Sequence, residues 1–119
     1  MRGEIGPALP GWGGWVVAED DDGTLVCAGA GGMTAADVGE VFLLYAEPRL
    51  QRRGAGSTVL DLLTRRQRDA GARAQEVAVT PGNDLALDFY AKHGFVLAGR
   101  RAPSQVARAE QSLLLRRAL

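Results

Sequence analysis

The sequence predicts a single α/β (α+β) domain in which helices pack on a mixed, mostly antiparallel sheet. Segments with strand and helix patterns follow one another in the order β-β-β-α-β-α-β-β, and this order is typical of helices packed on one sheet. A strand, a helix and a strand in succession form a right-handed crossover, which makes those two strands parallel. The 119 residues, 46% of them hydrophobic and 24% charged, suffice for one domain, residues 1–119, with one modest core.

The N-terminal part of the chain predicts an irregular arm and then a β-hairpin. Residues 1–14 are rich in Gly and Pro and have neither a helical nor a strand period. Residues 15–19 and 24–29 are strand-like, and the acidic turn between them ends in Asp22-Gly23, a pair that favours a tight hairpin turn. Residues 30–38 are small and glycine-rich, and we expect them to form a second hairpin connection.

The middle of the chain predicts a buried strand followed by an amphipathic helix. Residues 39–46 are almost continuously apolar after Glu40, as expected for a strand buried on both faces. Pro48 ends this strand because it cannot donate a backbone hydrogen bond. In residues 57–70 the apolar side chains recur on one helical face. Gly71 follows and is expected to end this helix.

The C-terminal part predicts a short strand, a second helix and two more strands. Residues 76–79 are apolar enough for a strand, and Asn83 or Asp84 is suited to cap the helix that follows. That helix ends at Gly94. The last two strands are expected at residues 95–99 and 110–115.

The glycine loop before the first helix predicts an anion-binding site. A helix N-terminus presents N–H groups without intrahelical partners, together with a partial positive charge. Gly54 and Gly56 have no Cβ, which lets a phosphate approach their backbone, and Arg52 and Arg53 add positive charge. No Lys-Ser/Thr follows the second glycine, and Val59 takes the place of a third, so the nucleotide-hydrolase and dinucleotide motifs are both absent. A plain strand-to-helix turn is the alternative.

Two motifs in this chain resemble those of the GNAT N-acetyltransferase superfamily. The run Gln51-Arg52-Arg53-Gly54-Ala55-Gly56 is similar to the family's Q/R-x-x-G-x-G/A signature. The family's N-x-x-A-x-x-F-Y-x-K-x-G-F pattern is matched downstream by Asn83, Ala86, Phe89, Tyr90, Lys92, Gly94 and Phe95. The motifs stand in the family's order about 30 residues apart, and the resemblance covers roughly residue 15 to the C-terminus.

The resemblance implies the GNAT-like acyl-CoA N-acyltransferase fold, in which acetyl-CoA lies where two central parallel strands splay apart. Here those strands are residues 41–46 and 76–79. The pantetheine arm would pair with backbone groups of the first strand, and the diphosphate would lie on N–H groups of the glycine loop. The residues implied to bind acetyl-CoA are Leu44, Tyr45, Ala46, Gln51, Arg52, Arg53, Gly54, Ala55, Gly56, Ser57, Asn83 and Tyr90.

The same resemblance implies two catalytic side chains. Tyr90 matches the tyrosine that many family members use as general acid for the departing CoA thiolate, and a core tyrosine beside Phe89 is the alternative. Glu40 stands eleven residues before Gln51 and matches the general base of the histone-acetyltransferase branch, where a carboxylate acts through water. A solvated charge at a strand start is the alternative. The base glutamate of the ribosomal-protein branch would fall at Ala78, which cannot accept a proton.

The region before the first hairpin departs from the family pattern. Family members usually begin with a strand and one or two helices that form much of the acceptor-substrate wall, whereas here only the arm of residues 1–14 precedes the hairpin. We therefore expect a homodimer, or a separate partner chain, to supply this wall, because a missing first strand leaves a sheet edge open to pairing.

The composition indicates which other partners and which cellular location to expect. Fourteen basic residues balance 14 acidic ones, so we expect no binding of nucleic acid or of an anionic membrane. Cys27 is the only cysteine, which excludes an internal disulfide and a cysteine zinc site. No metal is expected, and a reducing, cytoplasmic location is favoured. No apolar run reaches transmembrane length.

The function predicted is transfer of the acetyl group of acetyl-CoA to a primary amine by direct attack in a ternary complex. The acceptor, a small-molecule amine or a protein amine, is left open by the sequence. An acyl-CoA-binding regulatory module without turnover and a partner-dependent subunit are the alternatives, and the short N-terminal region keeps both open.

Overall fold

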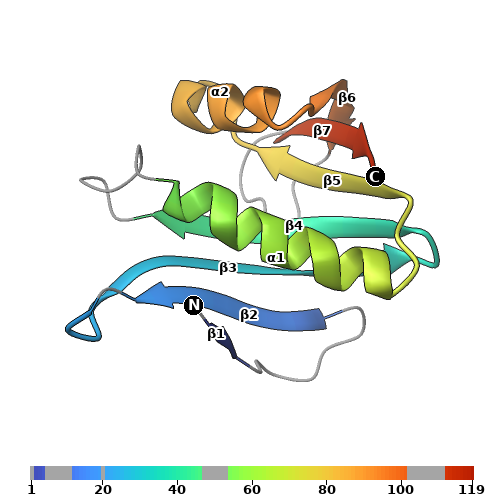
Figure 1. Ribbon diagram of the computed structural model, residues 1–119. Coiled ribbons are helices and arrows are strands. Elements are labelled where there is room, and N and C mark those ends of the chain that lie inside the picture. The colour runs from blue at the N-terminus through green and yellow to red at the C-terminus, as the bar shows by residue number, and fades with distance from the viewer. Residues whose placement is uncertain (1, 5–11, 20, 47–53, 102–111) are drawn as a thin grey trace.

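The computed structural model describes residues 2–4, 12–19, 21–46, 54–101 and 112–119. Within these residues the chain forms one seven-stranded sheet and two helices (Figure 1). The strands are β1 (Arg2–Glu4), β2 (Trp12–Glu19), β3 (Leu25–Ala35), β4 (Val38–Ala46), β5 (Ala74–Val79), β6 (Val96–Arg101) and β7 (Ser112–Ala118). The helices are α1 (Ala55–Asp69) and α2 (Asp84–Lys92).

The sheet is mixed, and its order is β1-β2-β3-β4-β5-β7-β6. Among the described strands, β4 and β5 are the parallel pair, and the other neighbours are antiparallel. Helix α1 connects these two parallel strands and crosses the sheet in front of β3 and β4 (Figure 1). The predicted fold class, with a parallel pair at the centre of a mostly antiparallel sheet, is confirmed.

The prediction of an irregular arm over residues 1–14 is wrong at both of its ends. Strand β1 pairs with β2 through Arg2↔Val17 and Glu4↔Trp15, and β2 begins at Trp12. Backbone pairing uses N–H and C=O groups that every non-proline residue carries, so it needs no side-chain period. The edge of β2 that the sequence led us to expect open is therefore covered along residues 15–17.

The second hairpin connection predicted at residues 30–38 is present but shorter, because β3 continues to Ala35 and β4 begins at Val38, which leaves only residues 36–37 for the turn. Small residues are needed here for packing rather than for a turn. A Cβ added at Gly31 would lie 2.8 Å from Nε2 of Gln67 on α1, a separation at which a side chain must shift. The glycines thus let the helix lie directly against β3.

The hydrophobic core lies between α1 and the sheet. Val59, Leu60 and Leu63 form the buried face of the helix, as the period predicted, and they pack against strand residues that include Val16 and Val41. The helix is followed by Gly71, whose φ of 103° is in the left-handed region, so the predicted end of the helix is confirmed.

Helix α2 begins as predicted at an asparagine cap. The Asn83 side chain accepts a hydrogen bond from the backbone N–H of Ala86 at 3.2 Å, which satisfies one of the free donors at the helix start. The helix gives way to β6 just after Gly94 and Phe95. Neither α1 nor α2, the helices of the described residues, is long and apolar enough to cross a membrane.

A buried polar layer ties α1 to the start of the parallel strand pair. The amide Nε2 of Gln67 on α1 donates to the backbone carbonyl of Glu40 at 3.0 Å, and Nε2 of Gln75 on β5 donates to Oε1 of Gln67 at 2.9 Å. Arg117 on β7 donates to Oε1 of Gln75 and to Oγ1 of Thr64, both at 3.0 Å. Buried polar groups are tolerated when they are satisfied in this way, so the layer fixes the position of the helix.

Candidate functional site

Strands β4 and β5 pair over a short length and then separate. Their parallel register runs from Val38↔Ala74 to Val41↔Val77, whereas β4 continues to Ala46 and β5 to Val79 without further register partners in each other. On its other side β4 stays paired with β3 as far as Ala46. The splayed pair that the family resemblance implied is therefore present.

A bulge in β4 marks the point of separation. The β3–β4 register steps from Ala30↔Leu43 to Gly31↔Val41, so β4 carries one extra residue at Phe42. Bulges bend a strand and increase its twist, and this one lies directly after the last pair with β5. The bulge gives a physical cause for the change in direction of β4.

A cavity of about 670 Å³ lies beside the splayed end. Its walls come from the end of β4, the first turn of α1 and the whole of α2. It is lined by Leu44, Ala46, Gly54, Gly56, Ser57, Asn83, Leu85, Ala86, Asp88, Phe89, Tyr90, Lys92 and His93. Seven of the residues implied to bind acetyl-CoA are thus brought together, namely Leu44, Ala46, Gly54, Gly56, Ser57, Asn83 and Tyr90.

The remaining implied residues are placed differently. Ala55 opens helix α1 without lining the cavity, and the Tyr45 side chain is 50% exposed on β4. Gln51, Arg52 and Arg53 lie outside the described residues. The Tyr45 side chain is therefore not part of the cavity wall, although its backbone belongs to the splayed segment.

The start of α1 faces this cavity and is suited to an anion. Gly54 caps the helix with φ 83°, a conformation that favours glycine, and no acidic residue lies in the first turn. The two glycines of the motif differ in role. A Cβ at Gly54 would meet nothing within 4 Å, whereas one at Gly56 would lie 3.3 Å from Cε1 of Phe89. Gly54 thus sets the backbone turn, and Gly56 lets α2 approach α1.

Tyr90 is the titratable residue most deeply buried in the cavity wall. Its side chain is 5% exposed and packs edge-on against the rings of Phe89 and Phe95, each with centroids 5.2 Å apart. Burial raises the pKa of the Tyr90 phenol well above its ordinary value, and the neighbouring Cys27 raises this pKa further. The phenol therefore remains protonated at neutral pH and can donate a hydrogen bond or a proton.

A polar pair at the cavity escaped the sequence analysis. Oγ of Ser57 on α1 lies 2.9 Å from Nε2 of His93, the C-cap of α2. Burial lowers the pKa of His93, Arg117 lowers it further, and Asp61 acts in the opposite direction. Positions 57 and 93 lie 36 residues apart, and no local sequence pattern signals their contact. His93 occupies the position between the lysine and the glycine of the second motif, which the family pattern leaves variable.

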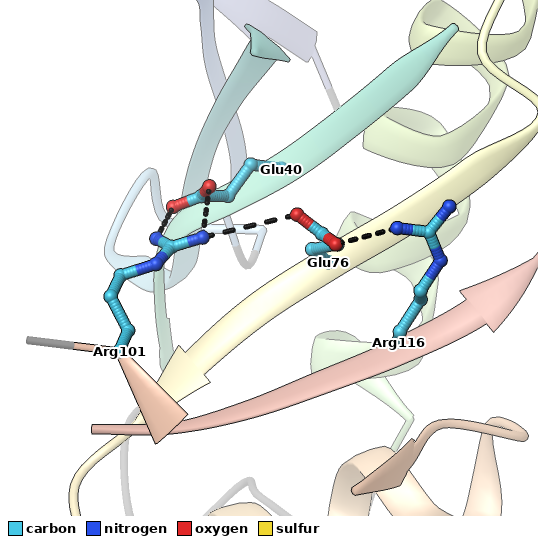
Figure 2. Close-up of polar contacts among 4 residues, drawn as sticks. All are labelled: Glu40, Glu76, Arg101 and Arg116. Carbon is cyan, nitrogen blue, oxygen red and sulfur yellow. Dashed lines mark hydrogen bonds and ion pairs between the residues drawn. The ribbon is translucent and has the colours of Figure 1, made fainter. Parts of the chain in front are cut away.

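Glu40 does not line the cavity. Its carboxylate accepts two hydrogen bonds from Arg101, 2.8 Å from Nη1 and 3.0 Å from Nη2. Arg101 also lies 3.9 Å from Glu76, which pairs with Arg116 at 2.7 Å (Figure 2). Glu40 and Glu76 are register partners, so their side chains project from the same face of the sheet.

The acid and base candidates lie on opposite faces of the sheet. Val41, next to Glu40, belongs to the core that α1 covers, and successive strand residues alternate between faces. Glu40 therefore points away from the helices, whereas Tyr90 comes from α2 on the helical face, where Ser57 and His93 join the two helices. Glu40 also lies one residue before Val41↔Val77, the last β4–β5 register pair. It is therefore next to the point where the two strands separate, on the face of the sheet opposite the helices.

Metal ligands do not cluster in the described part of the chain. No group of three or more His, Cys, Asp and Glu residues there could hold a metal ion. Cys27 is fully buried, and burial raises the pKa of its thiol.

Solved structures share this fold. Nourseothricin acetyltransferase superposes with a TM-score of 0.81 at 24% identity, over 97% of this chain and 69% of that one. Ribosomal-protein-alanine N-acetyltransferase from Brucella melitensis gives 0.70 at 19%, over 89% and 68%. A phosphinothricin acetyltransferase from Sinorhizobium meliloti, solved in complex with AcCoA, gives 0.69 at 19%, over 91% and 61%. No curated protein matches the sequence.

A family-level match covers most of the sequence. The profile of the acetyltransferase (GNAT) family matches residues 6–95. This span includes strand β4, the start of α1 and helix α2, from which the cavity is built. The chain therefore belongs to the GNAT family of acetyltransferases.

Proposed function

We propose that this protein transfers the acetyl group of acetyl-CoA to a primary amine by direct attack in a ternary complex. The observation that carries the proposal is the parallel pair that stops pairing at Val41↔Val77 beside a cavity that holds Tyr90 and the start of α1. A strand edge without a neighbouring strand offers donors and acceptors to an extended chain, and a helix N-terminus offers them to a phosphate.

The described residues fit acetyl-CoA in both size and chemistry. The cavity of about 670 Å³ is of the size of pockets that hold small organic ligands. Leu44 and Ala46 would lie along the pantetheine arm, Asn83 would hydrogen-bond its amide, and the N–H groups at the start of α1 would hold the diphosphate. When bound, acetyl-CoA supplies an activated acetyl group with a thiolate leaving group.

Tyr90 serves as the general acid in this proposal. The departing sulfur needs a proton, and a phenol whose pKa is raised by burial carries one throughout the physiological range. Tyr90 lines the cavity and is held by Phe89 and Phe95. Its fixed ring position directs the hydroxyl group to one place on the ligand.

Glu40 serves as the general base, through a water molecule. The attacking amine loses a proton as its bond to the acetyl carbon forms, and a carboxylate can take that proton. In this proposal base and acid act from opposite sides of the gap between β4 and β5. The acceptor would then approach on the face that bears Glu40 and Arg101.

The acceptor is proposed only as a class, a small-molecule or protein amine. The names of the similar structures point to different acceptors, namely nourseothricin, phosphinothricin and the alanine of a ribosomal protein. The chain spans 61–69% of the length of these three proteins. We further propose that the protein is cytoplasmic. We also propose that a second protomer or a partner completes the acceptor wall, and size-exclusion chromatography with light scattering would test this second proposal.

Thiol release from acetyl-CoA over a panel of amines, measured beside CoA binding by calorimetry, tests this function. Turnover with at least one amine is expected, and Glu40→Gln should lower kcat/KM at least 100-fold. Glu76→Gln is the matched control, because Glu76 is the register partner of Glu40 on the same face. An equal loss in both variants would remove Glu40 from the base role.

A binding module without turnover is the second candidate, and one observation favours it. Both carboxylate oxygens of Glu40 are taken up by Arg101, which leaves less room for a water molecule there. CoA binding without turnover on any amine would support this alternative. Absence of CoA binding would contradict both candidates and leave the partner-dependent subunit.

A further inference from the structure

Ser57 and His93 form a polar contact across the cavity that acetyl transfer itself does not require. Their side chains come within 2.9 Å, and both line the cavity. Ser57 belongs to the first turn of α1, and His93 caps the C-terminus of α2. A titratable group thus lies directly beside the anion-binding end of a helix.

His93 is contacted on two sides, at its backbone carbonyl and at its ring. The guanidinium Nη1 of Arg117 donates to the backbone carbonyl of His93 at 2.7 Å, and the Phe89 ring lies 4.8 Å from the imidazole between centroids, at an interplanar angle of 50°. Arg117 is itself held by Thr64 and Gln75 in the buried polar layer. The backbone of His93 is therefore tied to this layer, and the Phe89 ring packs beside its imidazole.

Four charged groups bear on His93 from the elements around it. Lys92 and Asp88 of α2 line the same cavity. Asp61 of α1 and Arg117 of β7 act on its titration in opposite directions, and burial together with Arg117 lowers the pKa of His93 overall. At neutral pH the free protein therefore holds His93 neutral, and the imidazole can still gain a proton.

We propose that Ser57 and His93 together bind the diphosphate of CoA and that His93 takes up a proton when this anion binds. This inference rests on the proposed function and adds two binding side chains to it. It also assigns a direction to the Ser57–His93 hydrogen bond in each state.

The exchange of hydrogen-bond direction explains why two side chains are needed. Neutral His93 can accept the hydroxyl proton of Ser57 at Nε2, which leaves no donor for a ligand at this point. Protonated His93 donates from Nε2 to the Ser57 oxygen, and the hydroxyl proton is then free to point at a phosphate oxygen. Proton uptake thus adds one positive charge and one hydroxyl donor to the anion site.

The sign of the pH dependence follows from linkage. An anion near the imidazole raises the pKa of His93 in the complex above its value in the free protein. The complex then binds more protons than the free protein between these two values, so affinity falls as pH rises through that window. Each unit by which the two values differ corresponds to about a tenfold change in affinity.

Dephospho-CoA is the suitable probe. It keeps the diphosphate but lacks the 3′-phosphate, whose own ionisation near pH 6 would obscure that of His93. Because His93 is the only histidine in the sequence, its imidazole proton signals in an NMR titration of the untagged protein are assigned without mutation. We expect the pKa of His93 to rise on addition of dephospho-CoA and to be unchanged by pantetheine, which has no phosphate.

Calorimetry with the same probe gives the second readout. The wild-type protein should bind more weakly at pH 8 than at pH 6 and should take up protons at intermediate pH, seen as a dependence of the heat on the buffer. His93→Gln should abolish the proton uptake and flatten the pH profile, and Ser57→Ala should weaken binding at pH 6. Arg65→Gln, an exposed position on the same helix and outside the cavity, should behave like the wild-type protein.

Three outcomes would overturn the inference. An unchanged pKa of His93 in the wild-type complex would do so even if His93→Gln failed to fold. A pKa change with CoA but not with dephospho-CoA would assign the contact to the 3′-phosphate instead. Absence of binding by the wild-type protein at every pH would overturn the proposed function together with this inference, whereas binding without a change at His93 would overturn the inference alone.

Discussion

The two ends of the β4–β5 pair differ in what surrounds them. At the paired end, from Val38↔Ala74 to Val41↔Val77, the strands are held by backbone register, by the amides of Gln67 and Gln75 on one face, and by Glu40 and its ion pair on the other. At the separated end, β4 borders a cavity with Tyr90 in its wall.

The difference shows how one sheet can be rigid and open at once. Polar groups at the paired end are buried and satisfied by each other, so a change there costs folding energy. Polar groups at the separated end face a cavity and are available to a ligand. Substitutions at the paired end should therefore lower stability, and Glu40, as the proposed base, is the residue there whose substitution should also lower activity. Substitutions at the separated end should lower activity with little effect on stability.

The largest effect is expected at the separated end, from Tyr90→Phe. The variant keeps the ring contacts with Phe89 and Phe95 and loses the proton donor. General acid catalysis contributes roughly 100- to 10,000-fold, so kcat should fall at least about 100-fold while the affinity for CoA is retained. Stopped-flow thiol detection and calorimetry measure the two quantities. Activity within threefold of wild type would remove Tyr90 from the acid role.

The largest effect on stability is expected at the paired end, from Gly39→Ala. A Cβ at Gly39 would overlap the side chain of Gln67, and overpacking of this kind costs about 2–3 kcal/mol. Chemical denaturation should show this loss. Gly54→Ala is the comparison at the separated end, where a Cβ meets nothing within 4 Å and only the left-handed backbone is strained, at roughly 1 kcal/mol. Equal losses would contradict the distinction between the two ends.

Most of the separated end could be predicted from local sequence. The glycine motif gave the start of α1, and the second motif gave the Asn83 cap and the place of Tyr90, because each depends on residues close together in the chain. The apolar run at residues 39–46 likewise gave strand β4. Local patterns are reliable where the structure they specify is local.

Contacts between distant residues could not be predicted in this way. The Arg101–Glu40 pair spans 61 positions and the Ser57–His93 pair 36, and nothing in either sequence neighbourhood marks its partner. The sequence predicts a connection where β3 continues, because the residue of α1 that requires a glycine at position 31 is Gln67, 36 positions further on. Strand β1 was missed because backbone pairing leaves no side-chain pattern.

A smaller loss of stability is expected when the ion pair at the paired end is broken. Arg101→Gln removes both donors to the Glu40 carboxylate, which is 8% exposed, and Arg101 is itself 31% exposed. Because solvent reaches the guanidinium, we expect about 1–2 kcal/mol rather than the larger cost of a fully buried pair. Arg116→Gln, at a side chain 47% exposed, should cost roughly 0.5 kcal/mol or less. Urea denaturation measures both losses of stability, and a larger loss in Arg116→Gln than in Arg101→Gln would contradict this assignment.

The smallest effect is expected from the protonation of His93 in the free protein. Because the pKa of His93 in the folded state is lowered from its ordinary value of 6.5, the unfolded chain binds more protons, and stability rises with pH across this window. The contribution of neutral His93 to the free energy of unfolding is fully present above pH 6.5 and is lost as the pH falls below that value. We expect the stability difference between wild type and His93→Gln to shrink by roughly 0.5 kcal/mol or less from pH 7.5 to 5.5, because the imidazole is only partly buried and screened by solvent. A difference that grows on acidification would mean that the free protein already holds His93 charged, and the separated end would then carry a fixed cation rather than one acquired with the ligand.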